Sequence, residues 1–224
     1  MNGQQAIEGS SEAHRVFGLR GNRMLNPERS ANRRQETLHA AARVFIERCY
    51  HTAAVEDVAR AMGVSKGVVY YYFRSKDEIC AEAICVAIEG AIKRLEAVTD
   101  RNLPPAETLR EAIGTHVEYN INLEEAGSYA MITREAKALS SESRARVLEL
   151  QRAYALAFTD IVRRGACDGA LARRDPSVTA MLILTAANYI ADWYRPKGRL
   201  PKHDMVEHVA AQLVDGLLPE ETRE

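Results

Sequence analysis

The chain has 224 residues, of which 46% are hydrophobic and 27% are charged, and its formal net charge is −1. This length allows one good hydrophobic core, or a small domain beside a larger one, in an ordinary soluble protein. No apolar run approaches the roughly 20 residues of a membrane helix, and the N-terminal segment lacks the apolar core of a signal peptide. We therefore expect a cytoplasmic protein with no membrane partner.

The spacing of potential metal ligands and nucleophiles argues against an enzyme. The four cysteines follow no paired spacing, and His203 and His208 are five residues apart, whereas helical zinc ligands are three or four apart. The chain also has no glycine-rich phosphate loop and no nucleophile elbow. We therefore expect no catalytic residue, no metal and no cofactor. An enzyme whose catalytic pair is buried in the C-terminal part is the less favoured alternative.

Hydrophobic periodicity predicts an all-α fold of about nine helices. Apolar residues recur at steps of three and four from Leu38 onwards, and glycine, proline or capping residues separate the repeats. No pair of strands is visible anywhere in the chain. The predicted helices cover residues 31–48, 55–62, 65–74, 76–101, 109–121, 129–139, a stretch from about 147 that closes near 169, 176–194 and 201–217.

The segment Val68–Phe73 is the most strand-prone in the chain, yet it has no partner strand. In a helix, Val69 and Phe73 share one face and can pack on the two preceding helices. A helix this short cannot bury two opposite faces, so its other side should present hydroxyl and ammonium groups to phosphate oxygens and base edges. The residues expected on that side are Lys66, Tyr70, Tyr71, Arg74 and Lys76. The alternative is an aromatic core cluster with solvated lysines.

Two short helices joined by a tight turn, Gly63 to Ser65, form a helix-turn-helix, whose second helix enters the major groove of DNA. Gly63 is suited to a left-handed stop of the first helix, and Ser65 can cap the second. Gly67 lies at the start of the second helix and lets its backbone approach DNA closely. The pattern therefore predicts double-stranded DNA as a partner.

The stretch AAARVFIERCYHTAAVEDVARAMGVSKGVVYYYFRSKDEI resembles the N-terminal domain of TetR-family transcriptional regulators. The detailed resemblance covers residues 33–80; beyond them only the number and order of helices agree. It implies a homodimeric, ligand-responsive repressor that binds a palindromic operator and is released by a small-molecule effector. The residues that this resemblance places at the DNA are Ser65, Lys66, Gly67, Tyr70, Tyr71 and the phosphate-binding Lys76.

The implied domains are a disordered basic arm at residues 1–29, a helix-turn-helix domain at 30–80, and a ligand-binding and dimerisation domain at 81–224. Residues 1–80 hold 12 Lys and Arg against 9 Asp and Glu, or +3, whereas residues 81–224 hold 18 against 22, or −4. A basic arm ahead of a near-neutral domain suits contact with a polyanion. The alternative is a solvated tail without a target.

Two residues depart from the family pattern and weaken the expected grip on the DNA backbone. Cys49 stands where a glycine with positive φ usually ends the first helix, and a non-glycine residue there costs roughly 1 kcal/mol. Ala54 replaces the Ser or Thr that usually caps the second helix, and such a cap is worth about 1 kcal/mol. We expect Thr52 to compensate and to contact DNA.

The segment ADWYRPKGRLP, residues 191–201, resembles the region between the last two helices of TetR-type regulators of lipid, steroid and aromatic-acid catabolism. Several such regulators respond to acyl-coenzyme A thioesters, so the resemblance implies a CoA thioester as effector. Two alternatives stay open: this segment only ends a helix at a dimer edge, or the larger domain dimerises without any ligand. The candidate effector-binding residues are Tyr119, Tyr129, Arg134, Tyr154, Phe158 and Tyr189.

The last two helices are expected to build the dimer interface. Small or polar residues on the first of them permit close helix packing, and the second supplies an apolar stripe. The residues expected there are Thr185, Ala187, Asn188 and Ala191, with Val206, Val209, Leu213 and Leu217.

Overall fold

The computed structural model describes residues 27–122 and 129–219, and all regular structure within them is helical. The all-α prediction is therefore confirmed, and the second and third helices lie within two residues of their predicted ends. The elements are α1 (Pro27–Thr52), α2 (Val55–Ala61), α3 (Lys66–Tyr72), α4 (Lys76–Thr99), α5 (Pro105–Ile121), α7 (Tyr129–Arg134), the 3₁₀ turn η1 (Glu135–Ala138), α8 (Ser141–Cys167), α9 (Pro176–Trp193) and α10 (Lys202–Asp215).

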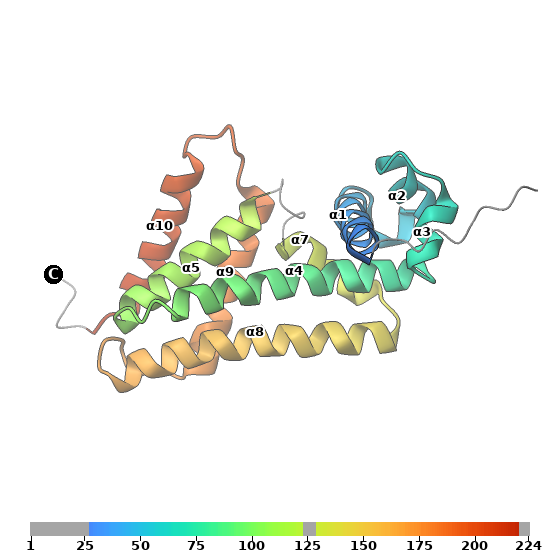
Figure 1. Cartoon of the computed structure of the whole chain (residues 1–224). Helices are drawn as coiled ribbons and strands as arrows, with labels where there is room; N and C mark the ends of the chain where they lie inside the picture. The colour runs from blue at the N-terminus through green and yellow to red at the C-terminus, as the bar shows by residue number, and fades with distance from the viewer. Residues whose placement is uncertain (1–26, 123–128, 220–224) are drawn as a thin grey trace, which may run out of the picture.

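Helices α1, α2 and α3 form a small three-helix unit at one end of the molecule (Figure 1). The 24-residue helix α4 starts beside this unit and runs away from it for about 36 Å. Helix α8 lies alongside α4, while α5, α9 and α10 pack together around the far half of the molecule (Figure 1). Helix α4 is therefore shared by the three-helix unit and the larger helical domain.

Part of the continuous hydrophobic core lies in the three-helix unit. It contains Leu38 and Phe45 of α1, Val58 of α2, Val69 of α3, and Phe73, which directly follows α3. Burial of Val69 and Phe73 against the two other helices explains why this strand-prone segment is helical, because tertiary packing overrides propensity. The predicted shared face of these two residues is confirmed.

Residues with special backbone conformations or side-chain caps set the ends of these helices. Gly63 has φ 66°, the left-handed conformation predicted for it. Ser75 accepts a hydrogen bond of 3.1 Å from the backbone N–H of Glu78 and thereby caps α4. Cys49 has φ 59° and ψ 153°, so α1 is kinked there. The predicted positive φ at Cys49 is confirmed, and this conformation costs a non-glycine residue about 1–3 kcal/mol.

Most of the predicted arm, residues 1–29, lies outside the described residues, and its last three residues form the start of α1. Across 27–122 and 129–219, none of the helices combines the length and apolarity needed to cross a bilayer. In the same part of the chain, His, Cys, Asp and Glu side chains form no group of three that could hold a metal ion.

Candidate nucleic-acid interface and polar core

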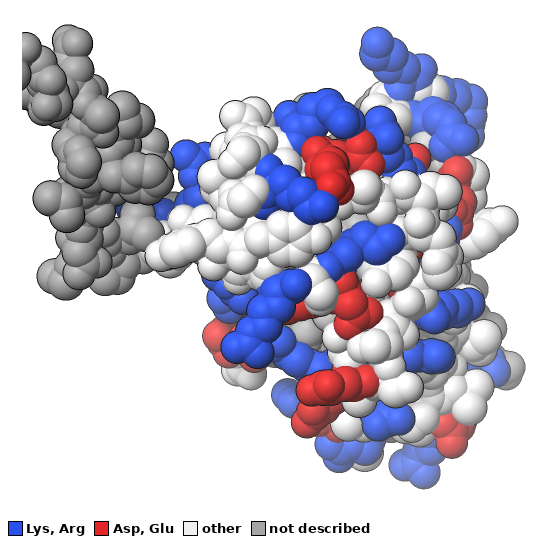
Figure 2. All heavy atoms as spheres, turned by 90° about the vertical axis from the view of Figure 1, so that its right-hand side faces the viewer, with Lys and Arg blue, Asp and Glu red and all other residues white. Residues whose placement is uncertain are grey.

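The exposed side of α3 carries the tyrosines that the sequence places at the DNA. Tyr70 and Tyr71 are 43% and 65% exposed, whereas Val69 is fully buried. A Cβ added at Gly67 would meet only the Ser65 hydroxyl, at 3.8 Å. The fold therefore does not require glycine at this position, whereas close approach of another molecule would. Figure 2 faces this end of the molecule and shows basic side chains spread over it, with acidic ones among them.

Two contacts hold Lys66 on this side of α3. Its ammonium forms an ion pair with Glu56 of α2 and lies 5.4 Å from the centre of the Tyr70 ring, within reach of a cation–π contact. The hydrogen bond between Lys66 and Glu56 raises the pKa of the lysine and lowers that of the carboxyl. Both side chains are about half exposed, so the pair contributes little stability. A DNA phosphate can therefore replace Glu56 as the partner of Lys66.

Lys76 is engaged inside the protein rather than extended into solvent. Its ammonium donates hydrogen bonds to the backbone carbonyls of Tyr50 at 2.8 Å and Ala53 at 3.1 Å. It also lies 4.3 Å from the centre of the Tyr50 ring. The last carbonyls of a helix have no partner within the helix, so Lys76 closes the C-terminal end of α1. A phosphate contact by Lys76, as the family resemblance implies, would have to use its remaining N–H.

In the turn before α2, Thr52 does not replace the helix cap that is missing at Ala54, in contrast to the expectation. The Thr52 hydroxyl donates to the Arg48 carbonyl, one turn earlier in α1, so any contact of this proton with DNA must first break that bond. The backbone N–H of Ala54 instead donates to the Asp57 carboxylate at 3.0 Å. This bond, followed by the one from Arg60, lowers the pKa of Asp57. Asp57 therefore supplies the polar partner for the start of α2.

A hydrogen-bonded group, here named the junction cluster, joins the three-helix unit to the larger domain. It consists of Tyr50 of α1, Asp77 of α4, Glu135 of η1, Ser140, and Ser143 of α8. Asp77 accepts hydrogen bonds from the backbone N–H and hydroxyl of Ser140, both at 2.8 Å, and from the Ser143 hydroxyl at 2.5 Å. Glu135 accepts one from the backbone N–H of Tyr50 at 2.7 Å. A shift of the η1–α8 segment can therefore be transmitted to the end of α1.

The ionised form of Asp77 suits this role as an acceptor. Burial alone would raise the pKa of its carboxyl, but the bonds from Ser143, Ser140 and the Tyr50 hydroxyl hold the pKa below its usual value. The pKa of Tyr50 is raised, first by its own burial and then by the neighbouring Asp77 charge. At neutral pH, Asp77 is therefore a charged acceptor, whose hydrogen bonds are stronger than those of a neutral group.

His116 of α5 is buried in the larger domain at the centre of a second polar group, here named the core polar cluster, with Asn120, Tyr154 and Asn188. Its Nδ1 is 2.9 Å from the Tyr154 hydroxyl, and its Nε2 is 3.0 Å from Oδ1 of Asn188. An amide oxygen only accepts. Nε2 also lies 3.1 Å from Nδ2 of Asn120, but that amide can donate to Oδ1 of Asn188 instead, so we assign the imidazole proton to Nε2 and a Tyr154 O–H bond to Nδ1. Burial lowers the pKa of His116 to about 4, so the ring is neutral.

The core polar cluster connects α5, α8 and α9 within otherwise apolar surroundings. The ring of Phe158 lies 5.4 Å from that of Tyr154 and 5.9 Å from that of His116, centre to centre. The Asn120 amide adds a donor to Oδ1 of Asn188 at 3.2 Å. Buried polar groups are tolerated when they are hydrogen-bonded, and the mutual hydrogen bonds of these side chains meet that condition in the interior.

The other predicted effector-binding residues lie in different surroundings. Tyr119 is buried on α5, while Arg134 makes two hydrogen bonds of 2.5 Å to the carboxylate of Asp192. Tyr189 is 64% exposed on α9, so it does not line the interior as expected, because it projects from the opposite side of its helix. Tyr129 begins α7, and its side chain lies outside the part of the chain whose side chains are described.

The outer face of α9 carries large apolar side chains. Its exposed members recur at helical spacing and are Val178, Met181, Leu182, Tyr189 and Trp193. Two residues expected on this face lie elsewhere, because Ala187 is fully buried in the core and Asn188 belongs to the core polar cluster. The apolar residues of α10 (Val206, Val209 and Leu213) and the following Leu217 are partly buried against their own core. An exposed apolar patch of this kind marks an interaction surface.

Comparison with known proteins identifies relatives over most of the chain. The HTH-type transcriptional repressor KstR2 of Mycolicibacterium smegmatis is 26% identical over 195 residues, which cover 85% of this chain and 93% of the relative. The structure of the ketosteroid transcriptional regulator KstR2 of Mycobacterium tuberculosis has a TM-score of 0.73 and 25% identity, with 84% and 96% of the two chains covered. AibR, solved in complex with isovaleryl coenzyme A and operator DNA, has a TM-score of 0.74 at 23% identity, with 84% and 98% covered.

Two family models match separate parts of the chain. The model described as "Bacterial regulatory proteins, tetR family" matches residues 38–83, which span the helix-turn-helix. The model described as "Tetracyclin repressor-like, C-terminal domain" matches residues 102–217, or 116 of the 224 residues. With the all-helical fold and a helix-turn-helix at its N-terminal end, the chain belongs to the TetR family of transcriptional regulators, which bind operator DNA and respond to a ligand.

Proposed function

We propose that the chain is a homodimeric repressor that binds a palindromic operator through α3 and leaves it when a coenzyme A thioester binds the larger domain. The observation that carries the DNA part is the exposed side of α3, where Lys66, Tyr70 and Tyr71 lie beside the unfilled space at Gly67. In the major groove these residues contact base edges and phosphates, and Ser65 at the start of α3 contacts the backbone.

The second copy of the chain binds at the outer face of α9. A palindrome is read by two recognition helices about 34–36 Å apart, or a multiple of that distance. A single chain carries one α3, so the dimer is needed to present the second. The apolar side chains Leu182 and Met181 support this face as the dimer contact, because they are exposed in the single chain, and a second copy would remove them from water.

The effector binds between α5, α8 and α9. Its acyl part lies against Tyr154 and Phe158, and a carbonyl or hydroxyl of the ligand exchanges hydrogen bonds with the core polar cluster. The thioester class is supported by the resemblance of residues 191–201 to regulators of lipid and steroid catabolism. AibR binds isovaleryl coenzyme A, although its likeness to this chain concerns the fold. The ligand must prefer a state in which the two α3 helices are wrongly spaced, since equal affinity for both states shifts nothing.

A gel-shift assay tests this proposal directly. The full-length protein is mixed with DNA flanking its own gene, with and without isovaleryl coenzyme A, longer acyl-CoA thioesters, the matching free acids and free coenzyme A. We expect a retarded band that one of the thioesters removes and that neither its free acid nor free coenzyme A removes. Release by the free acid alone would replace the thioester with a plain hydrophobic effector, and failure to retard any flanking DNA would contradict an operator beside this gene.

A further inference from the structure

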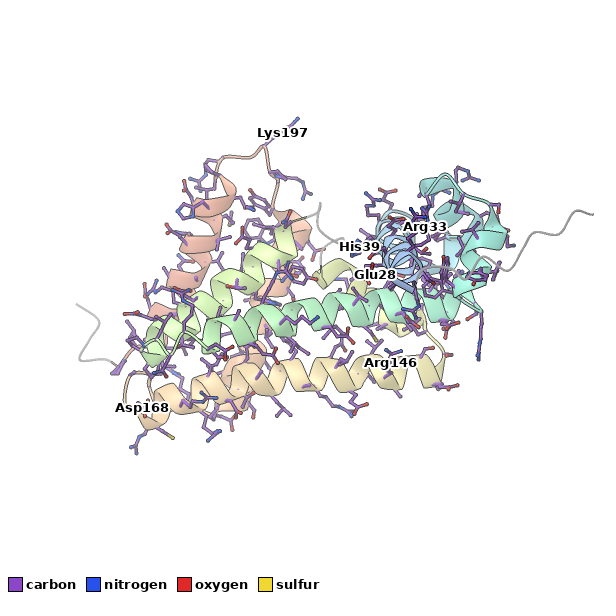
Figure 3. All side chains as sticks on the ribbon, viewed as in Figure 1. Glu28, Arg33, His39, Arg146, Asp168 and Lys197 are labelled. Atoms are coloured by element: carbon purple, nitrogen blue, oxygen red, sulfur yellow. The ribbon has the colours of Figure 1, made fainter. Side chains whose placement is uncertain are left out.

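A cleft of about 300 Å³ lies where α1, α4 and α5 meet, and we name it the hinge cleft. Helix α1 belongs to the three-helix unit and α5 to the larger domain, so the cleft spans the connection between the two. The residues used below are Gln35 and His39 of α1, Glu89, Lys93 and Arg94 of α4, and Tyr119 of α5. Figure 3 labels His39 on α1, well away from Lys197 in the turn between α9 and α10.

The floor of the hinge cleft is held in one arrangement. The Tyr119 hydroxyl donates to the Ala87 carbonyl at 3.1 Å. A Cβ at Gly90 would lie 2.7 Å from that hydroxyl, so glycine makes this packing possible. The Arg94 guanidinium lies 4.3 Å from the centre of the Tyr119 ring and donates to the Gly90 carbonyl at 3.2 Å. Arg94 is therefore positioned before any ligand arrives, which lowers the entropic cost of using it for binding.

The lining of the hinge cleft is cationic. Its described lining residues include two cations, Lys93 and Arg94, and one carboxylate, Glu89. Lys93 is exposed, and none of the other described side chains forms an ion pair with it. A flexible ammonium beside a positioned guanidinium is an arrangement that binds phosphate, the lysine as a point charge and the arginine as a planar fork.

The uncharged and acidic groups of the cleft further restrict the class of ligand that fits it. Gln35 and His39 are joined by a hydrogen bond of 3.1 Å, and both present groups that can hydrogen-bond phosphate or hydroxyl oxygens. Glu89 would repel a bare anion, but it accepts hydrogen bonds from hydroxyl or amino groups. A phosphate ester that also carries hydroxyl groups, such as a ribose phosphate, satisfies both the cations and Glu89.

We propose that the hinge cleft binds the phosphorylated ribose of a nucleotide. A coenzyme A thioester carries such a nucleotide at the end opposite to its acyl group. In naming the thioester as the source of the nucleotide, the inference rests on the function proposed above. Tyr119 lies one helical turn from His116, so the hinge cleft and the core polar cluster share helix α5. Arg134, one of the candidate effector-binding residues, is paired with Asp192 instead.

Occupation of the hinge cleft also explains how the effector reaches the DNA-binding helices. Gln35 and His39 lie on α1, whereas Lys93, Arg94 and Tyr119 lie on α4 and α5. A ligand held by both sides changes the separation of α1 from α4 and thereby the direction of α3. The free energy available for this change equals the difference in affinity of the ligand for the two arrangements.

Calorimetry with the full-length protein tests the hinge cleft, using isovaleryl coenzyme A, free coenzyme A and adenosine 3′,5′-bisphosphate as probes. Lys93→Glu reverses the charge of an exposed residue, and Lys197→Glu is the matched control at another exposed lysine. We expect Lys93→Glu to weaken binding of every probe that binds by about tenfold or more, the loss of one charge-assisted contact. Lys197→Glu should leave binding unchanged.

The outcomes separate this inference from the proposed function. If the thioester binds the wild type and Lys93→Glu equally, or if only Lys197→Glu weakens it, the hinge cleft is not the nucleotide site, while the thioester effector stands. If only adenosine 3′,5′-bisphosphate binds, and Lys93→Glu weakens it, the hinge cleft stands with a free nucleotide as its ligand, and the thioester effector fails. If no probe binds the wild type, both fail.

Discussion

The carboxylate of Glu135 accepts a hydrogen bond of 2.7 Å from the backbone N–H of Tyr50. Glu135 lies in η1 of the larger domain, whereas Tyr50 lies in the last turn of α1. The same tyrosine is approached by Lys76, whose ammonium binds its carbonyl. The peptide groups on both sides of Tyr50 are thus held by charged side chains from different helices, and the position of α1 depends on where η1 and α4 are.

Substitution of Asp77 should loosen the structure around the junction cluster. Asp77→Ala leaves the N–H and hydroxyl of Ser140 and the hydroxyl of Ser143 without their acceptor, at a cost of about 1–3 kcal/mol. We expect faster amide hydrogen exchange at the end of α1 and the start of α8. The control is Asp100→Ala, an exposed aspartate at the opposite end of α4. An unchanged exchange pattern in Asp77→Ala would show that these bonds do not hold the junction.

Substitutions on α3 should reduce DNA binding and leave the fold intact. Lys66→Ala and Tyr70→Ala each remove a largely exposed side chain, and we expect a loss of about 1–3 kcal/mol in operator binding. For Lys66→Ala the slope of log K against log salt should fall by about one unit. Lys137→Ala, at an exposed lysine of η1, is the control. Affinities equal to that of the wild type at matched salt would remove α3 from the interface.

Lys76→Ala should unfold at lower temperature than the wild type. The carbonyls of Tyr50, in the last turn of α1, and of Ala53, just after α1, lose their donor, which costs about 1–3 kcal/mol. Thermal unfolding followed by circular dichroism measures this change, and Lys76→Arg should recover part of it. Partial unfolding of Lys76→Ala would also reduce DNA binding. A reduced affinity of this variant therefore indicates loss of a phosphate contact only at temperatures at which the variant is fully folded. A melting temperature equal to that of the wild type would contradict the role given to this lysine.

Leu182→Glu should convert the dimer into a monomer and abolish operator binding. A charge in the middle of the α9 face cannot be buried against a second copy without a large desolvation cost. Leu156→Glu is the matched control, because Leu156 on α8 is 63% exposed and Leu182 is 66% exposed. Sedimentation velocity at micromolar concentration measures the state of each variant. A dimeric Leu182→Glu, or a monomeric Leu156→Glu, would move the interface away from α9.

His116 should make the protein less stable in weak acid. Its pKa is lowered from 6.5 to about 4, so above pH 6.5 the ring is neutral in both states and contributes no pH dependence. Between pH 6.5 and 4 the unfolded chain takes up the proton more readily, and the free energy of unfolding falls by roughly 3 kcal/mol as the pH is lowered.

Urea unfolding at several pH values measures this effect. The difference between wild type and His116→Gln should vary with pH over that window, whereas His203→Gln, at an exposed histidine, should follow the wild type. A His116→Gln profile parallel to that of the wild type would contradict the buried neutral ring.

Local patterns predicted the DNA-binding part well because its signals lie close together in the sequence. The left-handed Gly63 and the face shared by Val69 and Phe73 each depend on residues within one or two turns, whereas the positive φ of Cys49 was expected from the family resemblance. The core polar cluster was not predicted, because it joins His116 to Asn188, which lies 72 residues further along the chain. The sequence offered one indication of this cluster, namely that His116 lies close to the apolar stripe of its helix. Histidines at the exposed edge of a helix have the same position, so the pattern does not predict burial.

Side-chain partners were the other feature that sequence patterns did not predict. The ammonium of Lys76 reaches the carbonyls of Tyr50 in α1 and of Ala53 after it, and these contacts depend on the three-dimensional path of the chain around Cys49. Tyr189 and Asn188 are neighbours in sequence, yet one is exposed and the other bonds to His116. Successive residues of a helix are rotated by about 100° about its axis, so the two side chains point in different directions. Helix α9 is apolar on several sides, and its periodicity therefore does not indicate which side faces the core of the same chain.

At Gly67 the fold and the proposed DNA contact favour different amino acids. Its φ lies outside the left-handed region, and a methyl group there would meet nothing nearer than 3.8 Å. Alanine would therefore fit and would make the helix more stable by about 0.5–1 kcal/mol. Selection for thermal stability alone would favour alanine at this position. On the proposed function, the operator is what favours glycine here, because a methyl group would stand between the start of α3 and the DNA.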